Sequence, residues 1–290
     1  MQKYQAHQTN GGVRDCGRFF LDFTGEFQSQ QLSVQWVDQR RRTHEEIERL
    51  IESAWAHHSD RAGKTPRKLF DGSLCRLIDC QTDGSKLTLT LGPVSFKEFL
   101  GTNLSNAQVR YVHGTDVLAD ALGVSAAVAT DDGYLLLGRR SDAVAYNAGR
   151  IHPIGGMMEP AAHAGKVPDP FASLANELAE ELNVPTSLVK DVVCLGMVRD
   201  KDIVQPELLF DVTVAASAAD IRRAAASARD ADEHVELVPV RNCPSAIVRF
   251  IEDHHHELSA MAVAALLLHG QRCWGTGWFT ATRGYLRGVV

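Results

Sequence analysis

Three glutamates in one short segment are the residues of this chain best placed to do chemistry. Glu177, Glu180 and Glu181 stand at positions i, i+3 and i+4 within Asn176–Val184. On a helix with about 3.6 residues per turn these positions share one face. Clustered carboxylates repel one another unless a cation lies among them, and a hard dication such as Mg²⁺ prefers oxygen ligands. The segment therefore predicts a magnesium site or, alternatively, a solvated acidic stripe.

The elements around these glutamates predict that they lie on a helix. Asp169 is placed to cap its start and Pro170 to occupy its first position. Asn183 follows the last apolar turn and can adopt the left-handed conformation that ends helices. One flank of this helix is apolar and should pack on a sheet, which leaves the carboxylates facing a cleft; its residues are Phe171, Leu174, Leu178 and Leu182.

Two glycines upstream complete a recognisable pattern. The segments Gly155–Pro160 and Glu177–Glu181 together resemble an interrupted Nudix box. The match is incomplete, because Asn176 replaces the arginine of the box and Asn183 replaces its last glycine. The first glutamate of the box has no clear counterpart, since Ala162 stands at its spacing and Asp169 is only a nearby acid.

A narrower resemblance covers roughly residues 68–257. Phe96–Asn103, Leu118–Val124 and Leu137–Ser141 are similar to the branch of the Nudix family that splits UDP-glucose and UDP-galactose in animals. The resemblance implies a Mg²⁺-dependent diphosphatase, with Mn²⁺ able to serve, that releases UMP and a sugar 1-phosphate. Two alternatives remain open: a Nudix hydrolase of another nucleoside diphosphate derivative, similar to ADP-ribose, or a nucleotide sensor without catalysis.

The resemblance also implies the fold class and domain organisation. We expect an α/β protein, with a Nudix α/β/α sandwich and mixed sheet over residues 121–290 and a smaller N-terminal α+β domain over residues 1–120. The residue pattern agrees with alternating strands and helices. The expected strands are 19–27, 74–80, 86–91, 124–129, 134–137, 192–198, 208–214 and 237–240. The further expected helices are 43–57, 218–231, 246–252 and 258–268.

Several charged residues near strand ends could serve the diphosphate. Arg139 and Arg140 end a strand, and at most one of them should face the cleft because successive side chains point to opposite faces. Arg199 is a second phosphate candidate. Glu207 could be an additional metal ligand or a general base, with Glu233 and Glu236 as rivals.

The nucleoside and sugar have weaker candidates. Phe96 could stack on uracil and Asn103 could bind its polar edge, or they could be a core aromatic and a turn residue. Tyr146, with Asn147, could line the sugar pocket or form a turn. Gly155 and Gly156 would let the backbone approach the substrate.

Composition restricts the partners. A net charge of −6 gives no basic surface for nucleic acid, and aromatic residues make up only 7% of the chain. The polar start has no signal-peptide pattern and no apolar run is long enough to span a bilayer. Six cysteines without zinc-site spacing are expected as reduced thiols in a cytoplasmic protein. The oligomeric state is not predicted.

Overall fold

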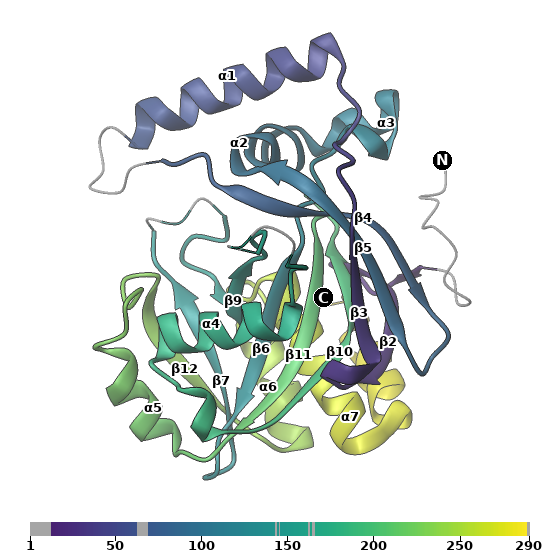
Figure 1. Cartoon of the computed structure of the whole chain (residues 1–290). Helices are drawn as coiled ribbons and strands as arrows, with labels where there is room; N and C mark the ends of the chain where they lie inside the picture. The colour runs from purple at the N-terminus through teal and green to yellow at the C-terminus, as the bar shows by residue number, and fades with distance from the viewer. Residues whose placement is uncertain are drawn as a thin grey trace.

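The large sheet forms the centre of the molecule (Figure 1). In this computed structural model the described residues are 13–62, 69–142, 144, 146–161, 163 and 166–288. Their nine-stranded sheet follows the order β1 (Arg14–Asp15), β2 (Phe19–Phe27), β10 (Val189–Asp200), β11 (Pro206–Val214), β6 (Gly123–Ala129), β7 (Tyr134–Arg140) and β12 (His234–Arg241), with β8 (Ile151–His152) beside β7 and β9 (Ile154–Met157) beside β6. The sheet is mixed, because β11 runs parallel to β6 while all other strand pairs of this sheet are antiparallel.

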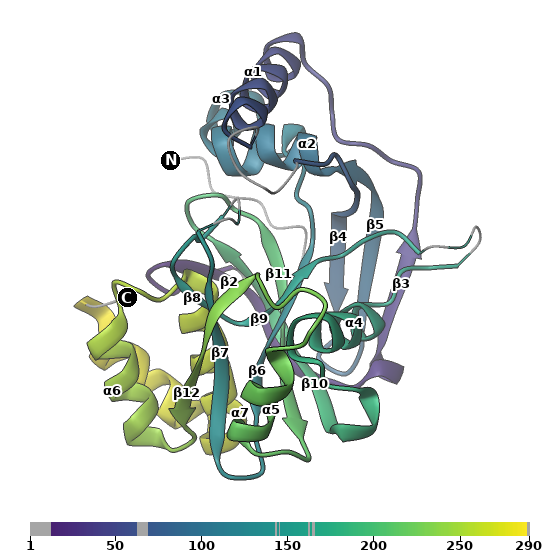
Figure 2. The same cartoon turned by 90° about the vertical axis from the view of Figure 1, so that its left-hand side faces the viewer.

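Helices cover both faces of this sheet (Figures 1 and 2). One face carries α4 (Pro170–Leu182) and α5 (Ala218–Ala225), and the other carries α6 (Pro244–His254) and α7 (Ala260–Tyr285). Alternate residues of each strand feed the two cores, so Leu208 and Phe210 pack towards α4 whereas Leu209 packs towards α7. These three layers confirm the predicted α/β sandwich with a mixed sheet.

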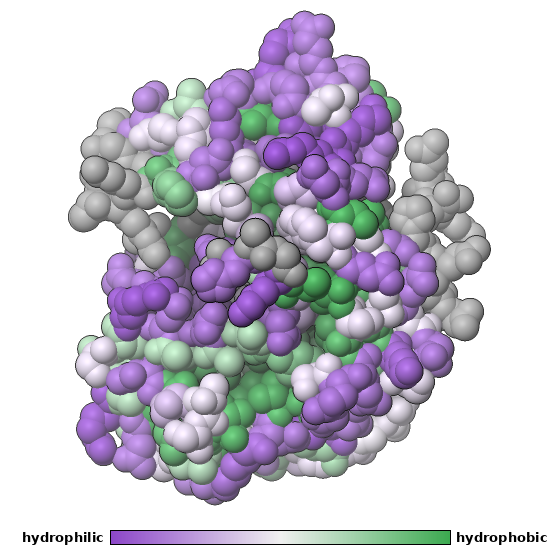
Figure 3. Space-filling model, in the orientation of Figure 1, coloured by the Kyte–Doolittle hydropathy of each residue, from purple (hydrophilic) through white to green (hydrophobic). Residues whose placement is uncertain are grey.

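A smaller N-terminal unit lies over one end of the large sheet (Figure 1). It contains a three-stranded sheet in the order β3 (Leu32–Trp36), β5 (Leu87–Ser95) and β4 (Ser73–Thr82), together with α1 (Glu45–Ala62), α2 (Phe96–Phe99) and α3 (Arg110–His113). Short segments of 3-10 or π helix connect the elements of the chain: Ser29–Gln31, Leu100–Leu104, Ala107–Val109, Thr115–Val117, Thr186–Leu188 and Leu286–Gly288. The outer surface over α1 is mainly hydrophilic (Figure 3).

The division into residues 1–120 and 121–290 stays a prediction. Strands β1 and β2 come from the first range but belong to the large sheet, since β2 pairs with β10. Within the N-terminal unit, the buried Arg41 forms ion pairs with Glu48 of α1 and Glu98 of α2, both at 2.8 Å. These ion pairs link the two helices.

Most predicted elements are confirmed, with corrections at their ends. The helix expected over 218–231 ends at Ala225, because the following chain turns back to α4, where the Asp230 N–H donates to the Glu180 carbonyl over 2.9 Å. The helix expected over 258–268 continues to Tyr285, beyond a non-helical residue at Gly275. None of the described helices combines the length and apolarity needed to cross a membrane.

Candidate functional site

The helix that carries the glutamates is built as the sequence predicts. The Asp169 side chain accepts a hydrogen bond from the Phe171 N–H at 2.9 Å, and Pro170 occupies the first turn. Asn183 has φ 56° and ψ 36°, the left-handed conformation that terminates α4. The apolar flank of α4 is buried against the sheet through Leu174, Leu178 and Leu182. This packing fixes the orientation of the opposite flank, which carries the glutamates.

Glu177 lies directly against the glycine pair of β9. A Cβ atom at Gly156 would come within 2.5 Å of Glu177 Oε1, so only glycine leaves room for this carboxylate. Burial, together with the negative charges of Glu181 and Glu180, raises the pKa of Glu177 to about 8. The glycine pair and the acidic helix, which the sequence joined only as two halves of one pattern, therefore lie side by side in the structure. Gly155, with φ 152°, contacts the β6 backbone instead.

Glu181 is the most buried of the three glutamates, at 3% exposure. His234 Nε2 donates to its Oε2 at 2.8 Å, while Oε1 has no hydrogen-bond partner among the described residues. Burial raises the pKa of Glu181, although the bond from His234 acts in the opposite direction. A buried acceptor left unpaired costs free energy, so the Glu177–Glu181 pair fits a site for a dication with oxygen ligands.

His234, at the start of β12, was missed by the sequence reasoning. It binds Glu181, whereas Asn176, which stands at the arginine position of the box, is exposed. One signal was available in the sequence: Gly138 interrupts an apolar strand. A Cβ atom there would lie 2.3 Å from the His234 ring, and glycine inside a strand often marks such a close approach.

Glu180 occupies the edge of this group. Its carboxylate pairs with Arg229, which follows α5. Its charge still contributes to the raised pKa of Glu177. The structure therefore brings Glu177 and Glu181 together, with Glu180 as a more solvent-accessible neighbour.

The two arginines at the end of β7 diverge as strand alternation predicts. Arg139 binds Glu257 at 2.7 Å and lies 3.6 Å from Glu236. Arg140 points the other way, and its charge lowers the pKa of Glu181. Its buried Nε has no hydrogen-bond partner among the described residues. Arg140 is therefore the one cation of the pair that is directed to the carboxylates.

Glu207 closes the same end of the sheet, at the start of β11. It is 6% exposed and accepts a hydrogen bond from Ser125. Burial raises its pKa to about 7, against the opposing effects of Ser125 and Arg140. His152 Nε2 lies 3.9 Å from Glu207 Oε1 and was not singled out from the sequence.

The rivals of Glu207 differ in position. The charge of Glu233 raises the pKa of both Glu177 and Glu181, so Glu233 lies near the pair. Glu236 is exposed and turned towards Arg139. Ala162, at the spacing of the first box glutamate, lies outside the described residues.

Two of the predicted substrate-binding residues, Arg199 and Asn103, form their contacts inside the protein. Arg199 is buried, and its Nε donates to Asp22 Oδ2 at 2.8 Å. Asn103 is fully buried, with its Nδ2 donating to the Ile203 carbonyl at 2.9 Å and its Oδ1 accepting from the Asp120 N–H at 2.9 Å. The structure thus gives Arg199 an internal ion pair and Asn103 an internal hydrogen-bond network, and does not bring either to the glutamate pair.

Phe96 and Tyr146 meet on one apolar cluster between the N-terminal unit and the large sheet. Both are partly buried and pack there with Met157, the residue that follows the glycine pair. The Tyr146 hydroxyl donates to Asp200 Oδ2 at 2.6 Å, and burial raises its pKa. The surface is hollowed between the N-terminal unit and the large sheet in Figure 3. Asn147 adopts a left-handed turn conformation, with φ 56°.

Comparison with known proteins identifies relatives by sequence. The uridine diphosphate glucose pyrophosphatase NUDT22 of Homo sapiens is 37% identical over 159 residues, which cover 46% of this chain and 52% of that protein. The protein of the same name from Mus musculus is 34% identical, covering 44% and 50%. Nudix hydrolase 9 of Arabidopsis thaliana is 26% identical, covering 51% and 56%. The chain thus spans about half the length of the curated relatives it matches.

Solved structures similar to this chain include the MutT protein from Methanosarcina mazei Go1. It is 19% identical, with a TM-score of 0.38, over 53% of this chain and 95% of that chain. No protein-family model matches the chain. From the sequence relatives, the chain resembles the Nudix hydrolases, and NUDT22 among them, which confirms the resemblance identified from its residues.

Proposed function

We propose that this protein is a Mg²⁺-dependent diphosphatase, with Mn²⁺ able to serve, that hydrolyses UDP-sugars such as UDP-glucose to UMP and a sugar 1-phosphate. The observation that carries the proposal is the placement of Glu177 and Glu181 one helical turn apart, with Glu177 against Gly156 and with the buried Glu181 Oε1 lacking a hydrogen-bond partner among the described residues. The printed activity of the NUDT22 relatives supports the choice of substrate.

Glu177 and Glu181 would hold the ion, with Glu180 as a further oxygen ligand after release from Arg229. A bound Mg²⁺ supplies charge neutralisation at the diphosphate and lowers the pKa of a bound water. His234 keeps Glu181 in one orientation through the 2.8 Å hydrogen bond.

Two residues of the same sheet end would act on the substrate. Arg140 would bind the diphosphate oxygens, because its unpartnered Nε offers a donor beside the carboxylates. Glu207 would accept the proton of the attacking water, since a base with a pKa of about 7 is matched to neutral pH. Water adds to one phosphorus, the P–O–P bridge breaks, and UMP and the sugar 1-phosphate leave.

The nucleoside and sugar would lie towards Phe96 and Tyr146. These aromatic residues share their cluster with Met157, one residue beyond Gly156, so they lie close to the glycine pair of β9. Stacking on Phe96 would supply apolar contact with the base.

Incubation of the whole chain with UDP-glucose and Mg²⁺ tests this proposal. We expect UMP and glucose 1-phosphate in equal amounts, abolished by Glu181→Gln and retained by Glu236→Gln, an exposed carboxylate that serves as the matched control. Cleavage of ADP-ribose in preference to UDP-glucose would overturn the substrate assignment. Binding of UDP-glucose without turnover would replace the enzyme by a sensor.

A further inference from the structure

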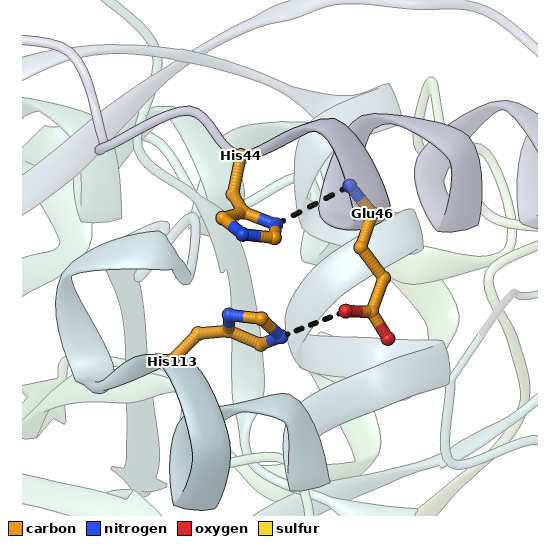
Figure 4. Close-up of side chains that lie close together, drawn as sticks. All are labelled: His44, Glu46 and His113. Carbon is orange, nitrogen blue, oxygen red and sulfur yellow. Dashed lines mark hydrogen bonds and ion pairs between the residues drawn. The ribbon is translucent and has the colours of Figure 1, made fainter.

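A second group of potential metal ligands lies on the N-terminal unit, outside the proposed active site (Figure 4). His44 immediately precedes α1, Glu46 lies in the first turn of α1, and His113 ends α3. Each offers one ligand atom, and these atoms all lie within 4.8 Å of one another. Glu46 Oε2 is 3.1 Å from His113 Nε2, and the two imidazole centroids are 4.3 Å apart.

Contacts around the group hold the His44 ring and the backbone of His113 in place. His44 Nδ1 accepts a hydrogen bond from the Glu46 N–H at 3.3 Å, which ties the first ring to the start of α1. Arg42 donates to the His113 carbonyl and pairs with Asp116 at 2.7 Å, which holds the end of α3 next to α1. The Arg42 charge is thus neutralised by a carboxylate outside the group.

Another cluster with similar residue types has a different geometry. His269 Nδ1 faces Asp211 Oδ1 at 2.9 Å, whereas its Nε2 lies 3.5 Å from Cys273 Sγ. Its ligand atoms also lie within 4.8 Å of one another. However, His269 Nε2 is 2.9 Å from Asn242 Oδ1, and Arg272 binds Asp211 at 2.9 Å. Both ring nitrogens and the carboxylate are therefore already engaged, which distinguishes this internal ion pair from the group at α1.

We propose that His44, Glu46 and His113 bind one transition-metal dication of the Zn²⁺ type. Imidazole nitrogens with one carboxylate are borderline ligands that suit Zn²⁺, Ni²⁺ or Cu²⁺, in contrast to the all-oxygen set proposed for Mg²⁺. His44 and Glu46 are exposed, so water completes the coordination. The ion replaces the contact between Glu46 and His113 and links the start of α1 to the end of α3.

Equilibrium dialysis of the full chain against Zn²⁺, with Mg²⁺ in excess, tests the site. We expect His44→Ala and His113→Ala to lose one equivalent of Zn²⁺ or to bind it at least about tenfold more weakly. His57→Ala removes an exposed histidine of the same helix and should bind like the wild type. Zn²⁺ should raise the Tm of the wild type more than that of His113→Ala, because a ligand of the native state stabilises it.

Two further measurements keep the test decisive. Glu46→Gln preserves side-chain size, so weakened Zn²⁺ binding in this folded variant supports the site even if an alanine variant fails to fold. Hydrolysis of UDP-glucose should be unchanged in His113→Ala, which separates this site from the proposed active site. Equal Zn²⁺ stoichiometry and affinity in the wild type, His113→Ala and Glu46→Gln would overturn the proposal.

Discussion

Gly156→Ala should damage catalysis while leaving the fold intact. The new Cβ atom would lie 2.5 Å from Glu177 Oε1, and ordinary contact begins at 3.4 Å, so the carboxylate must move by about 0.9 Å. Because that oxygen is the end of a flexible side chain, the displacement is cheap for stability. It shifts a proposed metal ligand, however, and a misplacement of about 1 Å can cost roughly 100-fold in rate.

The assay compares kcat/KM for UDP-glucose with the Tm of the same samples. We expect a fall of roughly 100-fold, or about 2.7 kcal/mol of transition-state stabilisation, and a Tm change of no more than about 4 °C. Gly284→Ala is the matched control: nothing lies within 4 Å of its Cβ position on the exposed end of α7. It should keep full activity and gain roughly 0.5–1 kcal/mol of stability.

Two results would show that Gly156 does not act in catalysis by leaving room for Glu177. Full activity in Gly156→Ala would show that the position of Glu177 does not matter to the reaction. A large loss of Tm would show that Glu177 is held rigidly and that the clash is structural.

Three further predictions test other parts of the structure. His234→Ala should lower kcat with little change in the Tm, and it should raise the Mg²⁺ concentration that gives the half-maximal rate. An unchanged Mg²⁺ concentration would contradict the role of His234 in positioning Glu181. Arg140→Ala should raise KM for UDP-glucose, whereas Arg139→Ala, whose partners are partly exposed, should not; equal effects of the two would remove Arg140 from the site. Burial lowers the pKa of His269, but Asp211 outweighs this effect and raises the pKa to about 9. The free energy of unfolding should therefore include up to about 3 kcal/mol that is present below pH 6.5 and is lost as the pH rises through 9. Urea unfolding across this range measures the loss, and a stability that does not change with pH would contradict it.

The glutamate helix could be predicted because its information is local. Glu177 and Glu181 are one turn apart, and Asp169 and Asn183 mark the two ends of their helix. The periodicity of the strands likewise follows from the sequence, as the hairpin of β6 and β7 shows.

The partners of these glutamates could not be predicted, because they depend on tertiary contacts. His234 reaches Glu181 from a strand far along the chain, and the only signal for it, Gly138 within another strand, does not say which side chain fills the space there. Asn103 could bind a base by residue type alone, but folding places it next to Asp120, where its amide is fully used. Burial, which decides such cases, is a property of the whole fold.

We propose that the Glu177–Glu181 pair binds the ion that enables UDP-sugar hydrolysis. The most direct measurement follows UMP and glucose 1-phosphate from UDP-glucose, with and without Mg²⁺, in the wild type and in Glu181→Gln. We expect UMP and glucose 1-phosphate in equal amounts only for the wild type with Mg²⁺, and we expect isothermal titration calorimetry to show one Mg²⁺ site fewer in the variant. Metal-independent turnover, or equal turnover in Glu181→Gln, would contradict it.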